Sequence, residues 1–149
     1  MKVATWNVNS IRARLDRALA WLDKAAPEIL CLQELKVTDE AFPFDALAEA
    51  GYRATVLGQK TYNGVAVLSR QEPDEVARRM GPDDADEQSR LIAARFGETW
   101  VLSAYVPNGG EVGSPKWDYK LAWFDRLRAH LARTFSPEAP LLLCGDLNV

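Results

Sequence analysis

Histidine and cysteine are scarce in this sequence, and long apolar runs are lacking. The chain has one histidine, His130, and two cysteines, Cys31 and Cys144, which both lie within apolar runs. Two cysteines are too few for a disulfide scaffold, so a reducing compartment, the cytoplasm, is the expected location. No apolar run approaches the roughly 20 residues that span a bilayer, and residues 1–7 hold no signal-peptide core. No contact with a membrane is expected.

Basic residues are not in excess either. There are 18 Lys and Arg against 21 Asp and Glu, which gives a net charge of −3. This balance argues against a dedicated nucleic-acid-binding module with a broadly basic surface. A polyanion would have to be held by a local basic patch or by a metal ion. The 149 residues are 48% hydrophobic and 26% charged, a globular mix sufficient for one domain or a substantial part of one.

The hydrophobic pattern predicts alternating strands and helices. An apolar stripe from Ile11 to Leu22 recurs with helical spacing, and Asn9 or Ser10 can cap this helix. Further helices are expected at Phe44–Ala50 and Lys116–Thr134. Strands are expected at Lys2–Val8, Glu28–Gln33, Tyr52–Leu57, Gly64–Ser69, Ser89–Phe96, Thr99–Val106 and Pro140–Cys144. This order is typical of a mixed α/β fold.

Three of the expected strands contain runs that are apolar on both faces, namely Val65–Leu68, Leu91–Ala94 and Leu141–Cys144. Such runs predict central strands that are covered on both sides. The segment Gly81–Gln88 holds four acidic residues and a proline, which predicts a solvated loop. His130 lies among surface-type residues of the last helix, so a solvated side chain is expected there.

Polar residues follow three of the expected strands. Asn7 follows the first, Gln33 and Glu34 end the second, and Asp146 and Asn148 follow the last. In α/β sheets, sites gather at the carboxyl ends of strands. An oxygen-rich pocket there suits Mg²⁺ or Mn²⁺, whereas the absence of Cys and His argues against zinc. Each residue alone is more simply explained as a turn, a cap or a solvated strand end; their coincidence at three strand ends favours a site.

Five segments in the same order carry a family resemblance: Trp6–Ala13, Leu32–Lys36, Tyr62–Ser69, Ser103–Gly109 and Gly145–Asn148. By these segments the chain resembles the exonuclease III and apurinic/apyrimidinic endonuclease family, within the endonuclease/exonuclease/phosphatase superfamily. Asn9–Ala13, Lys36 and Tyr105–Asn108 are similar to the DNA-repair branch in particular. Leu35 stands where that branch often has Thr, which is a minor departure.

The resemblance implies a metal centre. Glu34 would be the main metal ligand, with Asn7 beside it. Asp146 would act in proton transfer or as an outer-sphere metal ligand. Asn148 would orient the attacking water or the phosphate near the same metal. The implied cofactor is Mg²⁺, with Mn²⁺ as an alternative.

The resemblance also implies contacts to the substrate, which would be duplex DNA with an abasic site or a 3′ end. Tyr105 would stabilise the phosphate in the transition state, and Asn108 would hydrogen-bond the same phosphate. Contacts to the DNA backbone are implied for Arg12, Arg17, Tyr62 and Arg90. For each arginine, a solvated surface position is the simpler alternative. Lys36 and Lys60 are weaker candidates.

The fold implied by the resemblance is half of a four-layer α/β sandwich, with the chain as the N-terminal half of one catalytic domain. Relatives have a second half, whose sheet would pack on the first and which supplies an Asp-His pair. The expectation is therefore a DNA repair phosphodiesterase that is weak or inactive as these 149 residues. An exposed apolar sheet face would favour a homo-oligomer. Two alternatives are a phosphoesterase acting on a non-DNA substrate and a non-catalytic fragment that binds DNA or metal.

Overall fold

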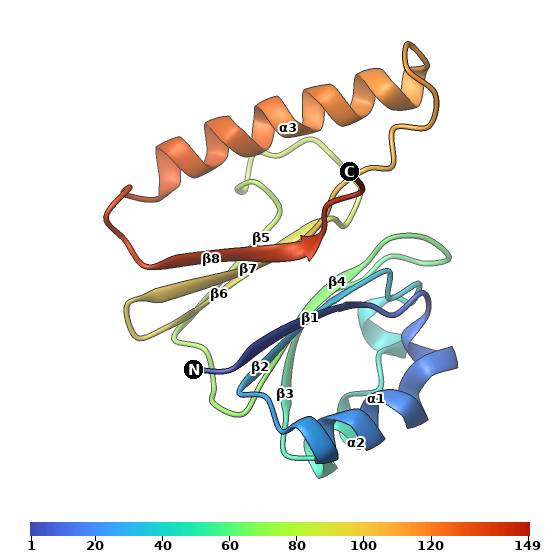
Figure 1. The fold of residues 1–149 in the computed structure, drawn as a ribbon, viewed down its shortest axis with the longest axis vertical. Coiled ribbons are helices and arrows are strands. Elements are labelled where there is room, and N and C mark those ends of the chain that lie inside the picture. The colour runs from blue at the N-terminus through green and yellow to red at the C-terminus, as the bar shows by residue number, and fades with distance from the viewer.

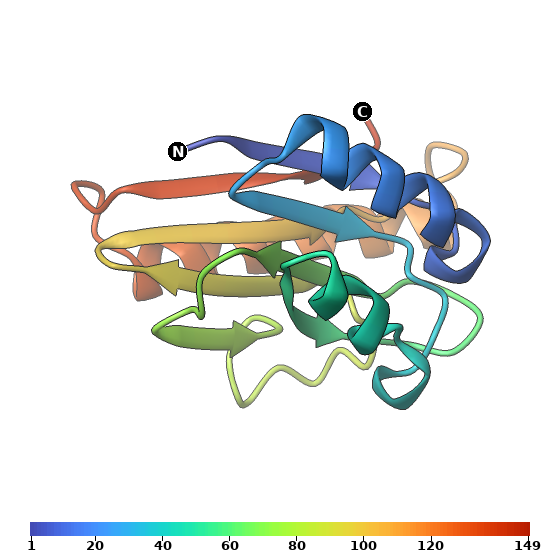
Figure 2. The ribbon, with the colours of Figure 1, turned by 90° about the horizontal axis from the view of Figure 1, so that it is seen from below.

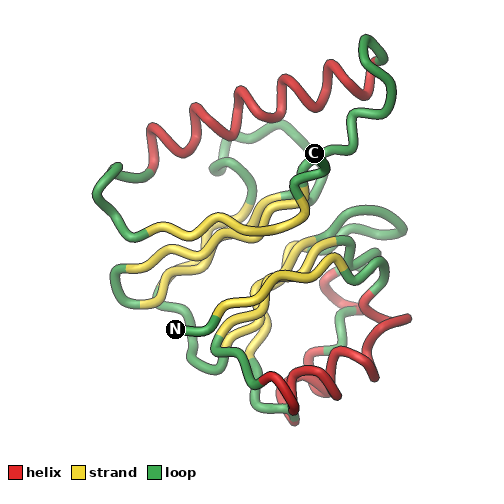
Figure 3. The backbone as a smooth tube through the Cα atoms, in the orientation of Figure 1, coloured by secondary structure: helices red, strands yellow, loops and turns green.

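A computed structural model describes residues 1–149 and arranges them in four layers (Figure 1). Helix α3 (Pro115–Thr134) covers the outer face of one sheet. Helices α1 (Ile11–Ala25) and α2 (Phe44–Glu49) cover the outer face of the other. The two sheets face each other in the middle, and the tube in Figure 3 shows the strands enclosed between helices.

Each sheet has four strands, and each contains one parallel pair. The first sheet has the order β1-β2-β4-β3, and the second has the order β5-β6-β7-β8. Strands β1 and β2 are parallel, as are β7 and β8, and all other neighbours are antiparallel. The bounds are β1 Val3–Asn7, β2 Ile29–Gln33, β3 Arg53–Leu57, β4 Val65–Ser69, β5 Glu75–Arg78, β6 Leu91–Phe96, β7 Thr99–Tyr105 and β8 Leu141–Asp146.

Local sequence signals set the helix boundaries. Ser10 caps α1, because its hydroxyl accepts a hydrogen bond from the Ala13 amide at 3.3 Å. Ser114 caps α3 by accepting from the Trp117 amide at 3.2 Å, and Pro115 follows at the first helical position. The expected helices and strands therefore occur where the pattern placed them, with small shifts at their ends. The structure adds a short 3₁₀ helix at Asp39–Ala41.

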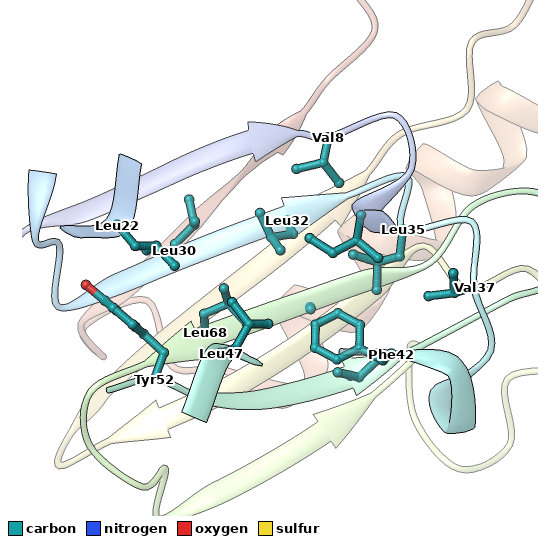
Figure 4. Packing of buried hydrophobic residues seen from close by; sticks show 13 residues of the cluster. Val8, Leu22, Leu30, Leu32, Leu35, Val37, Phe42, Leu47, Tyr52 and Leu68 are labelled. Carbon is teal, nitrogen blue, oxygen red and sulfur yellow. The ribbon is translucent and has the colours of Figure 1, made fainter. Parts of the chain in front are cut away.

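Apolar side chains fill all three spaces between the layers. Figure 4 shows the cluster between the first sheet and helices α1 and α2, where Leu30, Leu32 and Leu68 lie beside Leu22 and Leu47. Between the two sheets lie Ile29, Cys31, Val65 and Val67 from the first sheet and Ile92, Ala94 and Val101 from the second. A third cluster packs α3 onto the second sheet around Trp123 and Leu102.

The expectation of an exposed apolar sheet face is wrong. Both sheets come from this chain and bury their inner faces against each other, so all four layers are formed within these residues. The edge strands are β1 and β3 in the first sheet and β5 and β8 in the second, and β1 and β8 lie side by side (Figure 2). The expectation that Leu141–Cys144 is a central strand is also wrong, since β8 lies at an edge and is only partly buried. Val65–Leu68 and Leu91–Ala94 are buried inner strands as predicted.

Two further expectations about solvated residues are wrong. The His130 side chain is only 5% exposed, because its ring packs against Phe135 and its Nδ1 pairs with the Thr134 hydroxyl at 3.2 Å. In the acidic loop, the side chains of Asp84 and Asp86 are 9% and 11% exposed. Arg126 of α3 draws both carboxylates onto the helix, so this part of the loop is packed rather than solvated.

Strand β5 was not expected from the sequence. It is a short outer strand, its side chains are exposed or half-buried, and it pairs only with β6. Few of its positions contribute to a core, so its hydrophobic pattern is weak. None of the helices is both long enough and apolar enough to cross a membrane.

Replacing Gly145 by Ala is expected to destabilise the fold strongly. Gly145 has a φ of +149°, and a Cβ built there would lie 1.9 Å from the Ala104 carbonyl oxygen. Backbone strain and this clash together should lower the free energy of unfolding by about 3 kcal/mol or more. Gly97→Ala is the matched control, since Gly97 has a φ of +60° but open space around it, and should cost about 1–2 kcal/mol. Urea unfolding measures both, and equal losses would contradict the clash.

Candidate active site

The polar strand ends gather at one edge of the two sheets. The parallel register pairs Asn7 with Gln33 in the first sheet and Tyr105 with Asp146 in the second. Strands β1, β2, β7 and β8 therefore end at the same side of the molecule, on the right in Figure 1. This brings residues from both sheets to one place, as the sequence predicted.

The Asn7 side chain connects two carboxylates at this edge. Its Nδ2 atom donates to Glu34 Oε1 at 3.0 Å and to Asp146 Oδ2 at 2.7 Å. Its Oδ1 atom accepts from the Asn9 amide at 3.0 Å, which fixes the orientation of the carboxamide. One neutral group therefore holds a carboxylate from each sheet.

Glu34 is held by three neighbours. Besides Asn7, the Tyr105 hydroxyl donates to Glu34 Oε1 at 2.7 Å, and Lys36 Nζ lies 3.3 Å from Glu34 Oε2. Partial burial raises the pKa of Glu34, but the hydrogen bonds and the Lys36 charge outweigh burial, and the pKa lies below its ordinary value. Glu34 is therefore a carboxylate at neutral pH. Both Glu34 and Lys36 have left-handed backbone, with φ of 54° and 57°, a strained conformation that is typical of functional loops.

The Tyr105 ring is fixed by Arg90. The Arg90 guanidinium lies 4.7 Å from the centre of the ring and donates to the Tyr105 carbonyl oxygen at 3.1 Å. Burial and the hydrogen bond to Glu34 raise the pKa of Tyr105 well above its ordinary value. The hydroxyl is therefore protonated at neutral pH and acts as a donor.

Asn148 and Asn108 form a second part of the site next to Asp146. The Asn148 amide donates to Asp146 Oδ1 at 3.1 Å, and Asn148 Nδ2 donates to the Val106 carbonyl oxygen at 2.8 Å. Asn108 Nδ2 donates to Asn148 Oδ1 at 3.3 Å. Asn108 and Asn148 thus lie together, and their roles toward a phosphate stay a prediction.

The residues expected to hold DNA lie outside this centre. Arg12 and Arg17 are exposed on α1, and the Tyr62 side chain is 68% exposed on the loop between β3 and β4. Arg90 is half-buried and already occupied with Tyr105 and with Gln88, whose side chain accepts from Arg90 Nε at 2.7 Å. DNA contacts by these four residues stay a prediction.

Around the centre, the structure corrects the expectation for Gln33 and adds supporting residues. Gln33 does not join the centre, because it is buried between the sheets and donates to Ser103 Oγ at 3.0 Å. Lys120 of α3 is buried and donates to the Asn148 carbonyl oxygen. Lys36, which the sequence offered only as a weaker candidate for a DNA contact, lies beside Glu34. No sequence pattern marks the roles of Ser103 or Lys120.

The donor set fits a hard divalent cation. No group of three or more His, Cys, Asp or Glu side chains is present, so a cage made of such ligands is absent. Mg²⁺ commonly binds to one or two carboxylates and takes further oxygens from water and substrate phosphate. Glu34 and Asp146 each accept a hydrogen bond from the same Asn7 nitrogen, so one oxygen of each carboxylate lies near the other. Glu34, Asn7 and Asp146 are the residues that would hold it.

Comparison with known proteins defines the class. A model of the endonuclease/exonuclease/phosphatase family matches residues 4–149, and the chain belongs to this family. It is 38% identical over 154 residues to the DNA repair nuclease APEX1 of Danio rerio, covering 100% of this chain and 49% of that protein. It is 35% identical over 154 residues to exodeoxyribonuclease III of Haemophilus influenzae, covering 100% of this chain and 58% of that protein. The chain thus spans about half the length of the curated relatives it matches.

Solved structures give the same result. An AP endonuclease from Archaeoglobus fulgidus superposes with a TM-score of 0.95 at 40% identity, covering 100% of this chain and 58% of that one. A 3′ phosphatase from Neisseria, bound to a product DNA hairpin, also superposes with a TM-score of 0.95 at 40% identity. This match covers 100% of this chain and 58% of that one. The family resemblance and the fold class are confirmed.

A divalent cation is expected to stabilise the chain through Glu34. Saturating MgCl₂ should raise the melting temperature by about 5 °C, because a ligand that binds only the folded state shifts the folding equilibrium. Glu34→Gln should remove most of this rise, since it deletes one of two charged ligands. Glu40→Gln is the matched control, because Glu40 is an exposed carboxylate that is not among the residues of the centre. A rise that persists in Glu34→Gln would contradict this metal site.

Proposed function

We propose that the chain carries the metal-binding and phosphate-binding part of a DNA phosphodiesterase of base-excision repair. The activity would be that of exodeoxyribonuclease III, with cleavage at abasic sites and removal of nucleotides from 3′ ends. One observation supports this most strongly: Asn7 joins Glu34 and Asp146 across the two sheets while the Tyr105 hydroxyl donates to Glu34. Magnesium is the proposed cofactor, and Mn²⁺ would substitute for it.

Each residue of the centre has a chemical task in this proposal. The cation, held by Glu34 and Asn7, would polarise a phosphate oxygen and offset the developing negative charge. The Tyr105 hydroxyl donates to a phosphate oxygen in the transition state. Asp146 accepts the proton of the attacking water. Asn148 orients that water or the phosphate.

Contact with DNA in the proposal uses the residues around the centre. Helix α1 begins directly after the loop that follows Asn7, and a helix N-terminus favours phosphate. Arg12 and Arg17 on that helix would bind backbone phosphates, and the exposed Tyr62 ring would pack against the backbone. Asn108 would hydrogen-bond the phosphate that Tyr105 contacts. Such contacts read the shape of the duplex more than its sequence.

We propose that turnover by these 149 residues alone is slow. The sole imidazole, that of His130, lies on α3 against Phe135 and Thr134, outside the group of residues at the strand ends. Asp146 is then the one group in the centre suited to take a proton. General acid-base catalysis by a well-placed group contributes about 10²–10⁴-fold, so the absence of an imidazole from the centre is expected to be costly.

Magnesium-dependent nicking of a duplex with one abasic site tests the function. We expect slow nicking with Mg²⁺ and none with EDTA. Glu34→Ala should lower the nicking rate by more than the factor of about 10–100 that is typical when a residue supporting a metal ligand is removed. Glu40→Ala, an exposed carboxylate outside the centre, should nick like the parent chain. Turnover as fast as that of a full-length relative would contradict the slow-turnover proposal.

Other outcomes of the same assay point to different functions. DNA affinity without nicking, unchanged in Glu34→Ala, would indicate a non-catalytic binding fragment. Hydrolysis of small phosphoesters in preference to duplex DNA would indicate a family hydrolase with a different substrate. Nicking that persists in EDTA would contradict metal dependence.

We also propose self-association through the sheet edges formed by β1 and β8. Strands β1 and β8 lie side by side with unpaired outer edges, and an open edge readily pairs with a second copy of the chain. Light scattering at increasing concentration should show a dimer, and a monomer at high concentration would contradict it.

A cytoplasmic setting is proposed as well, supported by the free thiols of Cys31 and Cys144.

A further inference from the structure

A network of hydrogen bonds anchors the acidic loop to helix α3. Arg126 of the helix donates to Asp84 Oδ1 at 2.9 Å and to Asp86 Oδ2 at 2.5 Å. The Tyr119 hydroxyl, also on α3, donates to Asp86 Oδ2 at 2.6 Å. Asp86 Oδ1 in turn accepts from the Gln88 amide at 3.0 Å. The helix thereby fixes the loop immediately before Arg90.

The same network continues into the candidate active site. Gln88 Oε1 accepts from Arg90 Nε at 2.7 Å, and Arg90 donates to the Tyr105 carbonyl oxygen at 3.1 Å. The Arg90 guanidinium lies 4.7 Å from the Tyr105 ring centre and 5.9 Å from the Tyr119 ring centre. Tyr105 then donates to Glu34 at 2.7 Å. An unbroken series of contacts thus runs from α3 to the centre.

The charge states of the network keep it intact at neutral pH. Burial raises the pKa of Asp86, but bonds from Tyr119, the Gln88 amide and Arg126 outweigh burial and hold it below its ordinary value. Burial and the bond to Asp86 raise the pKa of Tyr119 to about 12. Asp86 is therefore an ionised acceptor, while Tyr119 is a neutral donor.

We propose that Tyr119, Asp86 and Arg126 are positioning residues for Tyr105 and act through Arg90. None of the three is hydrogen-bonded to Glu34 or Asp146, and the hydrogen bonds that lead from Asp86 to Tyr105 run through Gln88 and the Arg90 guanidinium. Stacking on the ring and bonding to its carbonyl restrict how the Tyr105 side chain can tilt. The catalytic consequence rests on the proposed function, whereas the placement of the ring can be measured without turnover.

Tyrosine NMR measures that placement directly. The chain has only four tyrosines, so ring-labelled protein gives few signals, and Tyr→Phe variants assign them. Arg126→Gln and Asp86→Asn should each shift the Tyr105 signal, because Arg90 loses its support. Arg128→Gln is the matched control on the same helix: the Arg128 side chain is 84% exposed and pairs with Asp125 instead of the loop. It should leave the Tyr105 signal unchanged.

The remaining tyrosines separate positioning from general loosening of the fold. Tyr52 is buried in the first sheet's core, and Tyr62 is exposed on a loop, so neither belongs to the network. A Tyr105 shift while Tyr52 and Tyr62 stay in place supports the proposal. An unmoved Tyr105 signal overturns it, and so does movement of all these signals together.

Kinetics then tests the catalytic consequence. In the nicking assay, Tyr119→Phe should lower kcat by about three- to tenfold with KM nearly unchanged, since the DNA contacts are intact and only alignment is lost. In a Tyr105→Phe background the same change should cost nothing further, because its effect passes through the Tyr105 hydroxyl. Arg126→Lys should restore part of the activity lost in Arg126→Gln.

The two hypotheses fail separately. If the parent chain shows no Mg²⁺-dependent nicking while the Tyr105 signal shifts in the network variants, the proposed function fails and the positioning role is supported. If nicking occurs, and both kcat and the Tyr105 signal are unchanged in the network variants, the positioning role is overturned and the proposed function remains.

Discussion

The donation of one amide nitrogen to two carboxylates is the interaction on which the site depends. Like charges at close range raise the free energy of a fold unless something between them compensates. Asn7 Nδ2 supplies that compensation, with bonds of 3.0 Å to Glu34 and 2.7 Å to Asp146. An amide can hold the oxygens together, but it cannot neutralise them. A pair of carboxylates held this way is therefore ready for a divalent cation, which supplies the charge that the amide lacks.

The packing of the two sheets brings the Glu34 and Asp146 oxygens together, one from each sheet. The apolar interface between the sheets sets their spacing, and the buried Gln33 adds a directional bond to Ser103 across it. At the end of β8, Gly145 allows close approach to the Ala104 backbone that any side chain would prevent. Left-handed backbone at Glu34 then turns the chain sharply at the end of β2. The strain at Glu34 is tolerated because three neighbours hold its side chain.

Much of this could be predicted from the sequence because the signals are local. Helical and strand periodicity located the elements, and the rule that strand ends gather at one edge assembled Asn7, Glu34 and Asp146. Part of what failed depended on distant partners: Asp84 is buried because Arg126 lies 42 residues later in sequence but beside it in space. His130 is different, because its partners Phe135 and Thr134 are close in sequence and the surface-type pattern around it did not indicate its burial. The edge position of β8 depends on which strands neighbour it, which its own apolar run does not encode.

The Tyr105 ring needs to be held in place because its hydroxyl has only one proton to donate. A phenol hydroxyl can donate one hydrogen bond, and in the structure Tyr105 donates it to Glu34 Oε1, with 2.7 Å between the two oxygens. In the proposed reaction the same proton must be directed at a phosphate oxygen, so the hydroxyl has to change partner while the ring stays aligned. Arg90 meets both requirements, because it contacts the face of the ring and the backbone carbonyl but leaves the hydroxyl free to reorient. Arg90 can do this only if its own place is fixed, and the proposed support is the set of hydrogen bonds from Arg126 of α3 through Asp86 and Gln88 of the acidic loop.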